Sequence, residues 1–327
     1  MYNALIAKLR NRAKRLAGNQ SGFTLLELLV VVAILAAIAG TAVVALQDTD
    51  ARASAAAHVA MMDELDKGIR EFRVLNKNRY PDRFDSIMDG GAGSTVGDTG
   101  AVQVSTAVHD ALGTLTLSTI TSAGEAAAGD TVVERLSDIG ITTLRVTYPT
   151  TGNAGHDPDG SGDCDNLAAL VADRGNAVVA GNIFLSPAAN GCGGDHPIGN
   201  ATTVLAWGGG TERITGQQVT NDIALSGAAL DISTADNGLP VMMAVGLGPS
   251  STLFDKTQLG GMTSVPVYRH VQSNEYNRFT ALFRIGTTDG AGGATAVDQV
   301  LLVAIVDGAG DTKEEELGEW DGTRNTI

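Results

Sequence analysis

An apolar run that holds a single carboxylate constrains this chain more than any other feature. Residues 21–40 read SGFTLLELLVVVAILAAIAG, and no charged residue occurs at positions 28–46. At about 1.5 Å of rise per residue, a helix over 28–46 nearly crosses a hydrocarbon core of about 30 Å. The run therefore predicts a membrane-spanning helix at 25–46, with Glu27 as its one ionisable group.

The charges on either side of the run predict its orientation. Residues 1–22 carry five cations and no acid, whereas Asp48 and Asp50 follow the run. Cationic flanks stay in the cytoplasm. We therefore expect a single-pass membrane protein with a cytoplasmic N-terminus and a globular domain outside the cytoplasm.

A secretory signal peptide is the alternative interpretation of the same run. Ala37-Ile38-Ala39 offers a small-x-small cleavage sequence, and cleavage there would give a mature chain that starts at Gly40. Two features argue against this alternative. The run is longer than a usual signal core, and an unpaired Glu27 at bilayer depth would cost a few kcal/mol.

The residues at the start of the run resemble a known processing signal. Gly22 followed by Phe23-Thr24-Leu25-Leu26-Glu27 is similar to the signal of type IV pilins and type II secretion pseudopilins. In that family a membrane prepilin peptidase cuts after the glycine and methylates the new amine. The resemblance therefore implies a basic leader at 1–22, cleavage after Gly22 and methylation of Phe23. Glycine suits the cut because it has no Cβ and enters a narrow active site in extended form.

The resemblance also implies a role for Glu27. Cleavage would place a cationic amine on Phe23, one helical turn before Glu27. In the family the corresponding glutamate pairs with the amine of a neighbouring subunit during assembly. The alternative is an acid favoured by the helix dipole, which is worth under about 1 kcal/mol. Many members of the family carry a proline further along the helix, where this chain has Val43-Val44 with Gly40 nearby.

Apolar residues continue beyond the run at helical spacing. They are Ala51, Ala55, His58, Met62, Leu65, Ile69 and Phe72. This stripe predicts one long helix over 23–76, which ends before Pro81. We expect the stripe to seat a sheet of the same chain, with His58 as a packed core histidine. Coiled-coil dimerisation through the stripe is the alternative.

Strand-like segments dominate residues 77–327, the predicted extracytoplasmic globular domain. They lie at 114–121, 142–148, 177–185, 203–207, 240–246, 278–285 and 299–307. The last is almost wholly apolar and is expected to be a central strand. We predict an α+β, pilin-like fold in which the long helix packs on an antiparallel β-sheet, with an inserted lobe around 150–200. The acidic C-terminal DTKEEELGEWDG is expected to be a solvated tail or short helix.

The only two cysteines, Cys164 and Cys192, predict one disulfide. An exported chain meets an oxidising compartment, which would close such a pair. The alternative is a metal site that also uses His156 and His196. The spacings match no familiar zinc pattern, so the disulfide is favoured.

Alternating acids in HDPDGSGDCDN, residues 156–166, predict a calcium site. The candidate ligands are Asp157, Asp159, Ser161, Asp163 and Asp165. Calcium takes six to eight oxygen ligands, and this alternation wraps carboxylates around one centre. The match to an EF-hand loop is partial because Ala168 stands where the bidentate glutamate belongs. A solvated Asp/Gly turn is the alternative.

No catalytic motif is present in the sequence. It lacks GxxxxGK[ST], HExxH and GxSxG, and its five histidines have no evident nucleophile partner. A net charge of −15 disfavours nucleic acid as a partner. We therefore expect that the protein is not an enzyme.

The leading functional hypothesis is a structural subunit of a type IV pilus-like or type II secretion pseudopilus filament. The resemblance implies the prepilin peptidase, an inner-membrane assembly platform, further copies of the chain and related subunits as its partners. The alternative is a membrane-anchored or minor-pilin module for binding or adhesion, which the large body favours. A secreted enzyme behind a plain signal is a third hypothesis.

Overall fold

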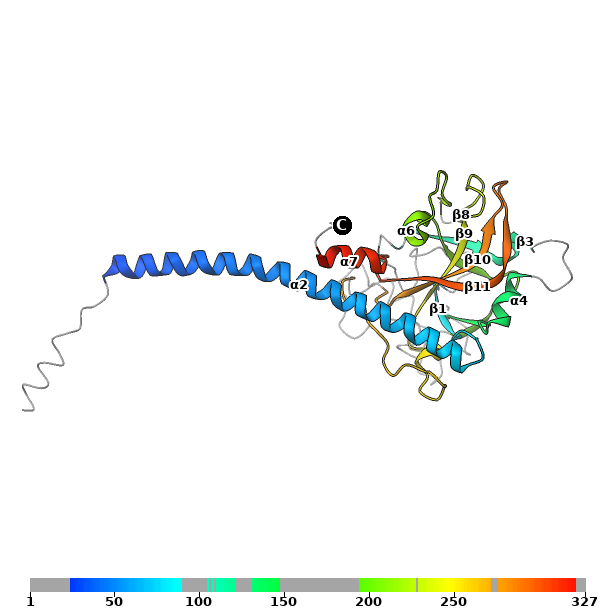
Figure 1. Cartoon of the computed structure of the whole chain (residues 1–327), viewed down its shortest axis with the longest axis horizontal. Coiled ribbons are helices and arrows are strands. Elements are labelled where there is room, and N and C mark those ends of the chain that lie inside the picture. Colours follow the sequence, from blue (N-terminus) through cyan, green and yellow to red (C-terminus); the bar gives the residue numbers. More distant parts are fainter. Residues whose placement is uncertain are drawn as a thin grey trace, which may run out of the picture. The chain divides into compact units, whose positions relative to one another are not determined.

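One long helix, α2 (Leu25–Leu75, 51 residues), opens the described part of the chain (Figure 1). The structure is a computed structural model that describes residues 24–89, 105, 108, 110–121, 131–147, 194–227, 229–271 and 276–321. The chain divides into two compact units, Met1–Ser54 and Ala55–Ile327. Residues of α2 belong to both units, so the outer half of the helix is part of the globular unit.

A sharp turn, rather than Pro81, ends α2. Lys77 and Asn78 adopt left-handed backbone angles, with φ of 58° and 67°. The Arg73 guanidinium donates a hydrogen bond of 2.6 Å to the Asn78 side-chain oxygen, and the Asn76 amide donates to the Phe72 carbonyl. These bonds satisfy groups that a helix end leaves open. The chain then passes through Pro81 into the first strand.

The described strands form one sheet, and short helices lie between them. The strands are β1 (Phe84–Asp89), β2 (Leu112–Thr116), β3 (Ile120–Thr121), β4 (Thr143–Thr147), β5 (Gly194–Pro197), β6 (Thr203–Trp207), β7 (Ala224–Ser226), β8 (Ala229–Asp231), β9 (Pro240–Gly246), β10 (Thr280–Thr288) and β11 (Ala294–Val306). The helices are η1 (Leu117–Thr119), α4 (Val132–Asp138), α6 (Thr211–Thr215), η3 (Thr252–Phe254) and α7 (Lys313–Asp321).

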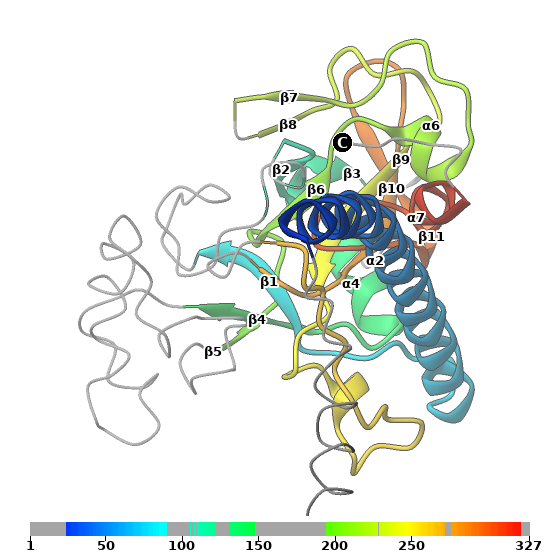
Figure 2. The ribbon, with the colours of Figure 1, turned by 90° about the vertical axis from the view of Figure 1, so that its left-hand side faces the viewer.

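The sheet is mixed, whereas the sequence predicted an antiparallel one. Its main path is β3-β11-β10-β9-β6-β2-β8-β7, and β1 joins it by pairing with both β9 and β4. The central pairs are antiparallel, but β1–β4, β2–β8 and β3–β11 are parallel. Figure 2 shows β1, β4 and β5 grouped on one side and the β7–β8 hairpin on another. The parallel pairs join strands that are not consecutive in the chain, which hydrophobic patterns do not reveal. The predicted α+β class is confirmed.

The outer half of α2 packs on this sheet, as the apolar stripe predicts. Ala55, His58, Met62, Leu65, Ile69 and Phe72 are all buried. Met62, Leu65, Ile69 and Phe72 share one core cluster with Val245 of β9, Phe283 of β10 and Val300 of β11. Burying a side chain of this size contributes about 1.5 to 3 kcal/mol. The stripe is therefore occupied by the chain's own sheet.

The most buried strand is β9 and not β11, which corrects the prediction for 299–307. Every residue of β9 is buried. By contrast β11 pairs with β3 only at Ala294 and Thr295, so β3 does not cover the rest of that edge of β11. Leu301 of β11 is 42% exposed. Apolar residues of β11 pack in two core clusters, Val300 and Ile305 in the one that includes α2 and Val306 in the other, which explains their number.

Candidate assembly site

The first turn of α2 is closed by reciprocal hydrogen bonds between Thr24 and Glu27. The Thr24 backbone N–H and hydroxyl donate to Glu27 Oε2 over 2.9 and 3.1 Å. The Glu27 N–H donates back to Thr24 Oγ1 over 3.3 Å. This capping box satisfies N–H groups that a helix start leaves open. Both hydrogen bonds from Thr24 end at Glu27 Oε2, and neither uses Glu27 Oε1.

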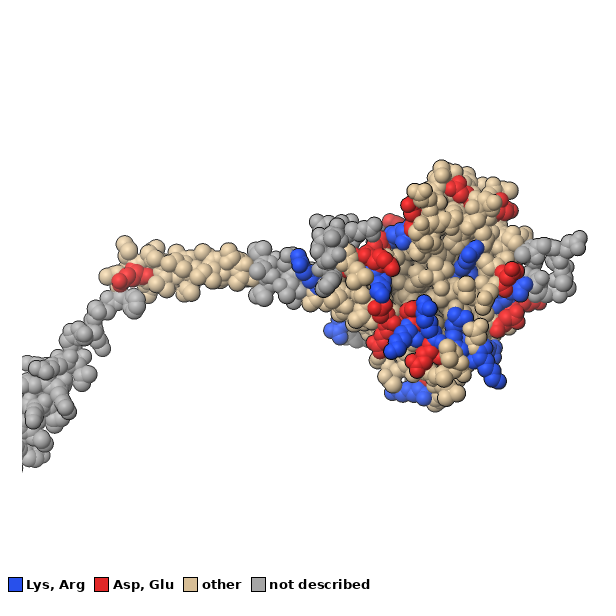
Figure 3. All heavy atoms as spheres, in the orientation of Figure 1, with Lys and Arg blue, Asp and Glu red and all other residues tan. Residues whose placement is uncertain are grey.

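The apolar half of α2 exposes its side chains all round. Residues 24–43 are all exposed, and Leu25 is 84% and Leu35 59% exposed. Charged side chains are absent from 28–43 but numerous on the globular unit (Figure 3). Among the described residues, Leu25–Val43 is the one helical segment long and apolar enough to cross a membrane. An apolar surface this large needs a cover of lipid or protein.

A local weakness lies near the end of this apolar half. Gly40 is helical, with nothing within 4 Å of the place that a Cβ would occupy. The next residue, Thr41, donates its hydroxyl hydrogen bond to the Ile38 carbonyl over 2.9 Å. Both features lower helix stability, glycine by about 1 kcal/mol relative to alanine.

The comparisons with known proteins bear on this segment. The family described as the prokaryotic N-terminal methylation motif matches residues 18–43. The chain carries the N-terminal methylation motif. This motif is the hallmark of type IV pilins and pseudopilins, and the α+β arrangement is consistent with a pilin-like fold. No curated protein and no solved structure matches the chain.

The methylation motif indicates a type IV pilin-like or pseudopilin subunit that is anchored in a membrane. A motif of this kind implies processing by a prepilin peptidase and assembly with other pilins. It also indicates a structural rather than an enzymatic protein. The match ends at residue 43, so it does not extend to the globular unit.

Several residues singled out from the sequence lie outside the described part of the chain. They are the processing residues Gly22 and Phe23, the cysteines Cys164 and Cys192, and the calcium candidates Asp157, Asp159, Ser161, Asp163 and Asp165. The leader at 1–22, the strand predicted at 177–185 and most of the lobe around 150–200 also lie outside it. The cleavage, disulfide and calcium assignments stay predictions.

A second polar cluster was missed by the sequence analysis. His58 of α2, Asp307 just after β11 and Glu316 of α7 are 4%, 0% and 3% exposed. His58 Nδ1 lies 3.0 Å from Glu316 Oε1. Burial, and then the neighbouring Glu316 carboxyl, raise the pKa of Asp307 to about 7. Burial likewise raises the pKa of the adjacent Tyr268 above its usual range.

The C-terminal acidic segment is not a solvated tail, because α7 is anchored to the globular unit. Thr312 caps the helix by donating its N–H and hydroxyl to Glu315 Oε2 over 2.9 Å each. Glu315 and Glu316 are both 3% exposed. Lys313 pairs with Asp63 of α2. The short helix expected for this segment is confirmed by α7. The solvated tail is wrong, because the partners of these acids lie on distant segments, which a run of charges does not show.

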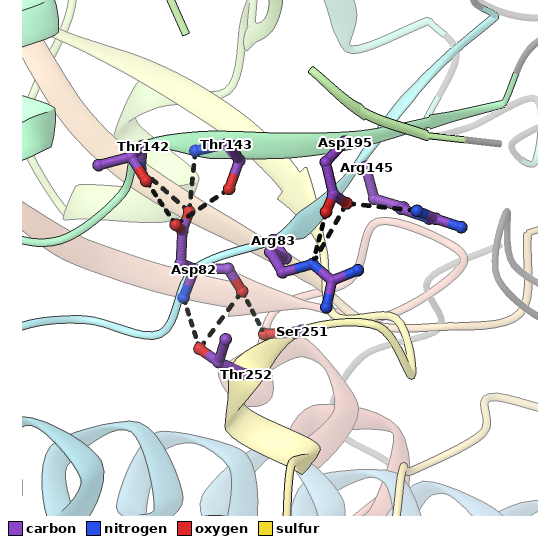
Figure 4. A network of polar contacts seen from close by, with 8 residues as sticks. All are labelled: Asp82, Arg83, Thr142, Thr143, Arg145, Asp195, Ser251 and Thr252. Carbon is purple, nitrogen blue, oxygen red and sulfur yellow. Dashed lines mark hydrogen bonds and ion pairs between the residues drawn. The ribbon is translucent and has the colours of Figure 1, made fainter. Parts of the chain in front are cut away.

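A third polar network, around Asp82, is structural. The Asp82 carboxylate accepts four hydrogen bonds, from the backbone N–H and the hydroxyl of both Thr142 and Thr143, over 2.6 to 3.0 Å (Figure 4). Its backbone binds Ser251 and Thr252, beside η3. Both carboxylate oxygens are thus engaged. The network ties the segment after α2 to β4 and to η3.

We expect Asp82→Ala to lower the free energy of unfolding by roughly 2 to 4 kcal/mol, because two backbone N–H groups and two hydroxyls lose their acceptor. Urea unfolding of the full chain in detergent, followed by fluorescence, measures this difference. Asp138→Ala is the matched control, because Asp138 is exposed at the end of α4 and should change stability by under about 0.5 kcal/mol. Equal stability of the two variants would contradict the structural role of Asp82.

Proposed function

We propose that this chain is a structural subunit of a type IV pilus-like or type II secretion pseudopilus filament. It is processed by a prepilin peptidase and assembled through its apolar N-terminal helix. The observation that carries the proposal is the methylation motif at 18–43, which includes the part of α2 up to residue 43 where every side chain is exposed. An exposed apolar surface of this kind is stabilised when lipid covers it, and also when it packs against the same surface of other subunits.

The assembly step follows from the chemistry at the start of α2. Cleavage after Gly22 exposes an amine on Phe23, and methylation leaves it cationic. The capping box uses Glu27 Oε2, which leaves Oε1 for an ammonium group of a neighbouring subunit. A carboxylate and an ammonium group in a low-dielectric surround stabilise each other far more than in water. The pair thereby sets the axial register between neighbouring subunits.

The proposed topology places the N-terminus in the cytoplasm before processing. The five cations of residues 1–22 support this orientation. The globular unit then lies in the periplasm or outside the cell. The partners are the prepilin peptidase, an inner-membrane assembly platform, other copies of the chain and related pilin-like subunits.

A binding or adhesion role in a membrane-anchored or minor pilin is the second candidate. The size of the globular unit, Ala55–Ile327, favours it, because such a body has ample surface for a ligand. The capped Glu27 favours a polymerising subunit instead, since registry along a filament needs that carboxylate in every copy.

Immunogold electron microscopy of sheared filaments, with antibody against the globular unit, separates the two roles. We expect gold along the whole filament length and a dominant band of this chain in the preparation. Gold confined to filament ends would support the minor subunit instead. Filaments of normal number in a strain that lacks this chain would contradict the proposed role as principal subunit.

A further inference from the structure

The buried cluster of His58, Asp307 and Glu316 has the composition of a cation site. One ligand atom from each residue lies within 4.8 Å of the other two. Donors about 2.0 to 2.1 Å from one tetrahedral ion lie about 3.3 to 3.4 Å apart. His58 Nδ1 lies 3.0 Å from Glu316 Oε1, so a small shift would suit both to one ion. The three residues come from α2, the end of β11 and α7, so only the fold brings them together.

With both carboxyls ionised, the cluster brings two negative charges, and a protonated His58 would neutralise one of them. The nearby cations Arg213 and Lys313 are paired with other acids, Arg213 with Glu315 and Asp311, and Lys313 with Asp63. One dication beside a neutral imidazole balances both carboxylates.

Asp307 supplies the second observation, an open oxygen atom. Its Oδ1 accepts hydrogen bonds from the N–H groups of Ala309 and Asp311 over 2.8 and 2.9 Å. Its Oδ2 is fully buried and has no hydrogen-bond partner in the described part of the chain. A buried polar atom without a partner is rare in folded proteins. A bound cation would satisfy it.

We propose that His58, Asp307 and Glu316 bind a divalent transition-metal ion, represented by Zn²⁺, in the globular unit. One imidazole with two carboxylates suits zinc and similar ions, whereas calcium and magnesium prefer all-oxygen ligands. The site thus differs in chemistry from the calcium site predicted at 156–166. His270 is exposed and its ring centroid lies 4.8 Å from that of His58, so the cluster comes close to solvent there.

The ion would fasten the C-terminal part of the globular unit to α2. Asp307 directly follows the strand β11, and Glu316 lies in the first turn of α7. The metal would join both residues to His58, which lies on the apolar stripe of α2 that packs on the sheet. Because a metal that binds only the folded state adds its binding free energy to stability, the ion would stabilise this junction.

Zinc binding by the full chain in detergent tests the proposal. After chelator treatment and dialysis, we expect one high-affinity Zn²⁺ per chain by calorimetry, and a Tm raised by a few degrees when Zn²⁺ is added. Co²⁺ added in place of Zn²⁺ should give a visible absorption spectrum typical of nitrogen and oxygen ligands. These measurements use the unaltered chain and do not depend on the folding of a variant.

Variants locate the ion. His58→Gln and Glu316→Gln should weaken Zn²⁺ binding by at least roughly tenfold. The matched control Glu314→Gln changes an exposed glutamate of the same helix and should leave affinity unchanged. His196→Gln tests the alternative metal site with the two cysteines and should leave it unchanged too. Asp163→Asn tests the loop at 156–166 and should also leave it unchanged. Zinc that is lost in Asp163→Asn but kept in Glu316→Gln would overturn the proposal. So would a wild-type chain with neither bound Zn²⁺ nor a Tm shift, because a proton shared between the carboxyls would then balance the cluster.

Discussion

Replacing Glu27 by glutamine should abolish filament formation while leaving the chain processed and in the membrane. The glutamine side-chain oxygen still accepts the hydrogen bonds of Thr24, so the capping box and the start of α2 are kept. What is lost is the negative charge that we propose pairs with the amine of the neighbouring subunit. Without that pair, each incoming subunit would bury an uncompensated ammonium group, at a cost of several kcal/mol.

Filament counts by negative-stain electron microscopy measure the effect of Glu27→Gln. Glu64→Gln is the matched control, because Glu64 is exposed on the outer half of the same helix. We expect the control to form filaments at the wild-type level. Glu27→Asp keeps the charge with a shorter reach and should give an intermediate number. If Glu27→Gln formed filaments in wild-type numbers, the proposed ion pair between Glu27 and the neighbouring amine would not be needed for assembly.

Replacing Gly22 by valine should hold the whole chain at the mass of the precursor. Valine adds a branched side chain at the cut, where glycine, which has no Cβ, leaves room for the chain in a narrow active site. The uncut leader leaves Phe23 without a free amine, so Glu27 has no ammonium partner and filaments should be absent. Immunoblotting shows the precursor by its slower migration, and intact-mass measurement confirms the retained 22 residues.

Gly18→Val is the control for Gly22→Val. It makes the same change four residues upstream, inside the same basic leader. We expect this variant to be cut and assembled like the wild type. Cleavage of Gly22→Val at the normal position would show that the glycine is not required there. Equal failure of both variants would point to a general effect on membrane insertion.

Local signals in the sequence account for much of the fold. The spacing of Met62, Leu65, Ile69 and Phe72 predicts the buried face of α2, because helical periodicity is a local property. Segments 203–207 and 240–246 coincide with β6 and β9. The short strands β7 and β8 were missed, because three-residue segments hold too little pattern.

The polar contacts between distant segments were not predictable from the sequence. His58 lies 258 positions from Glu316, and nothing local to either residue marks the pair. The acidic stretch around Glu315 and Glu316 has the composition of a solvated segment, although both side chains are buried. The capping box of Thr24 and Glu27, by contrast, is a local pattern of the type S/T-x-x-E, and it was available in the motif itself.

The mass of the N-terminal peptide of the mature protein tests the central claim most directly. Chain purified from membranes of cells that contain a prepilin peptidase is digested and its terminal peptide is analysed by tandem mass spectrometry. We expect a peptide that starts at Phe23 and carries one methyl group on its amine. A mature chain that starts at Gly40, or one that keeps Met1 and the whole leader, would contradict it.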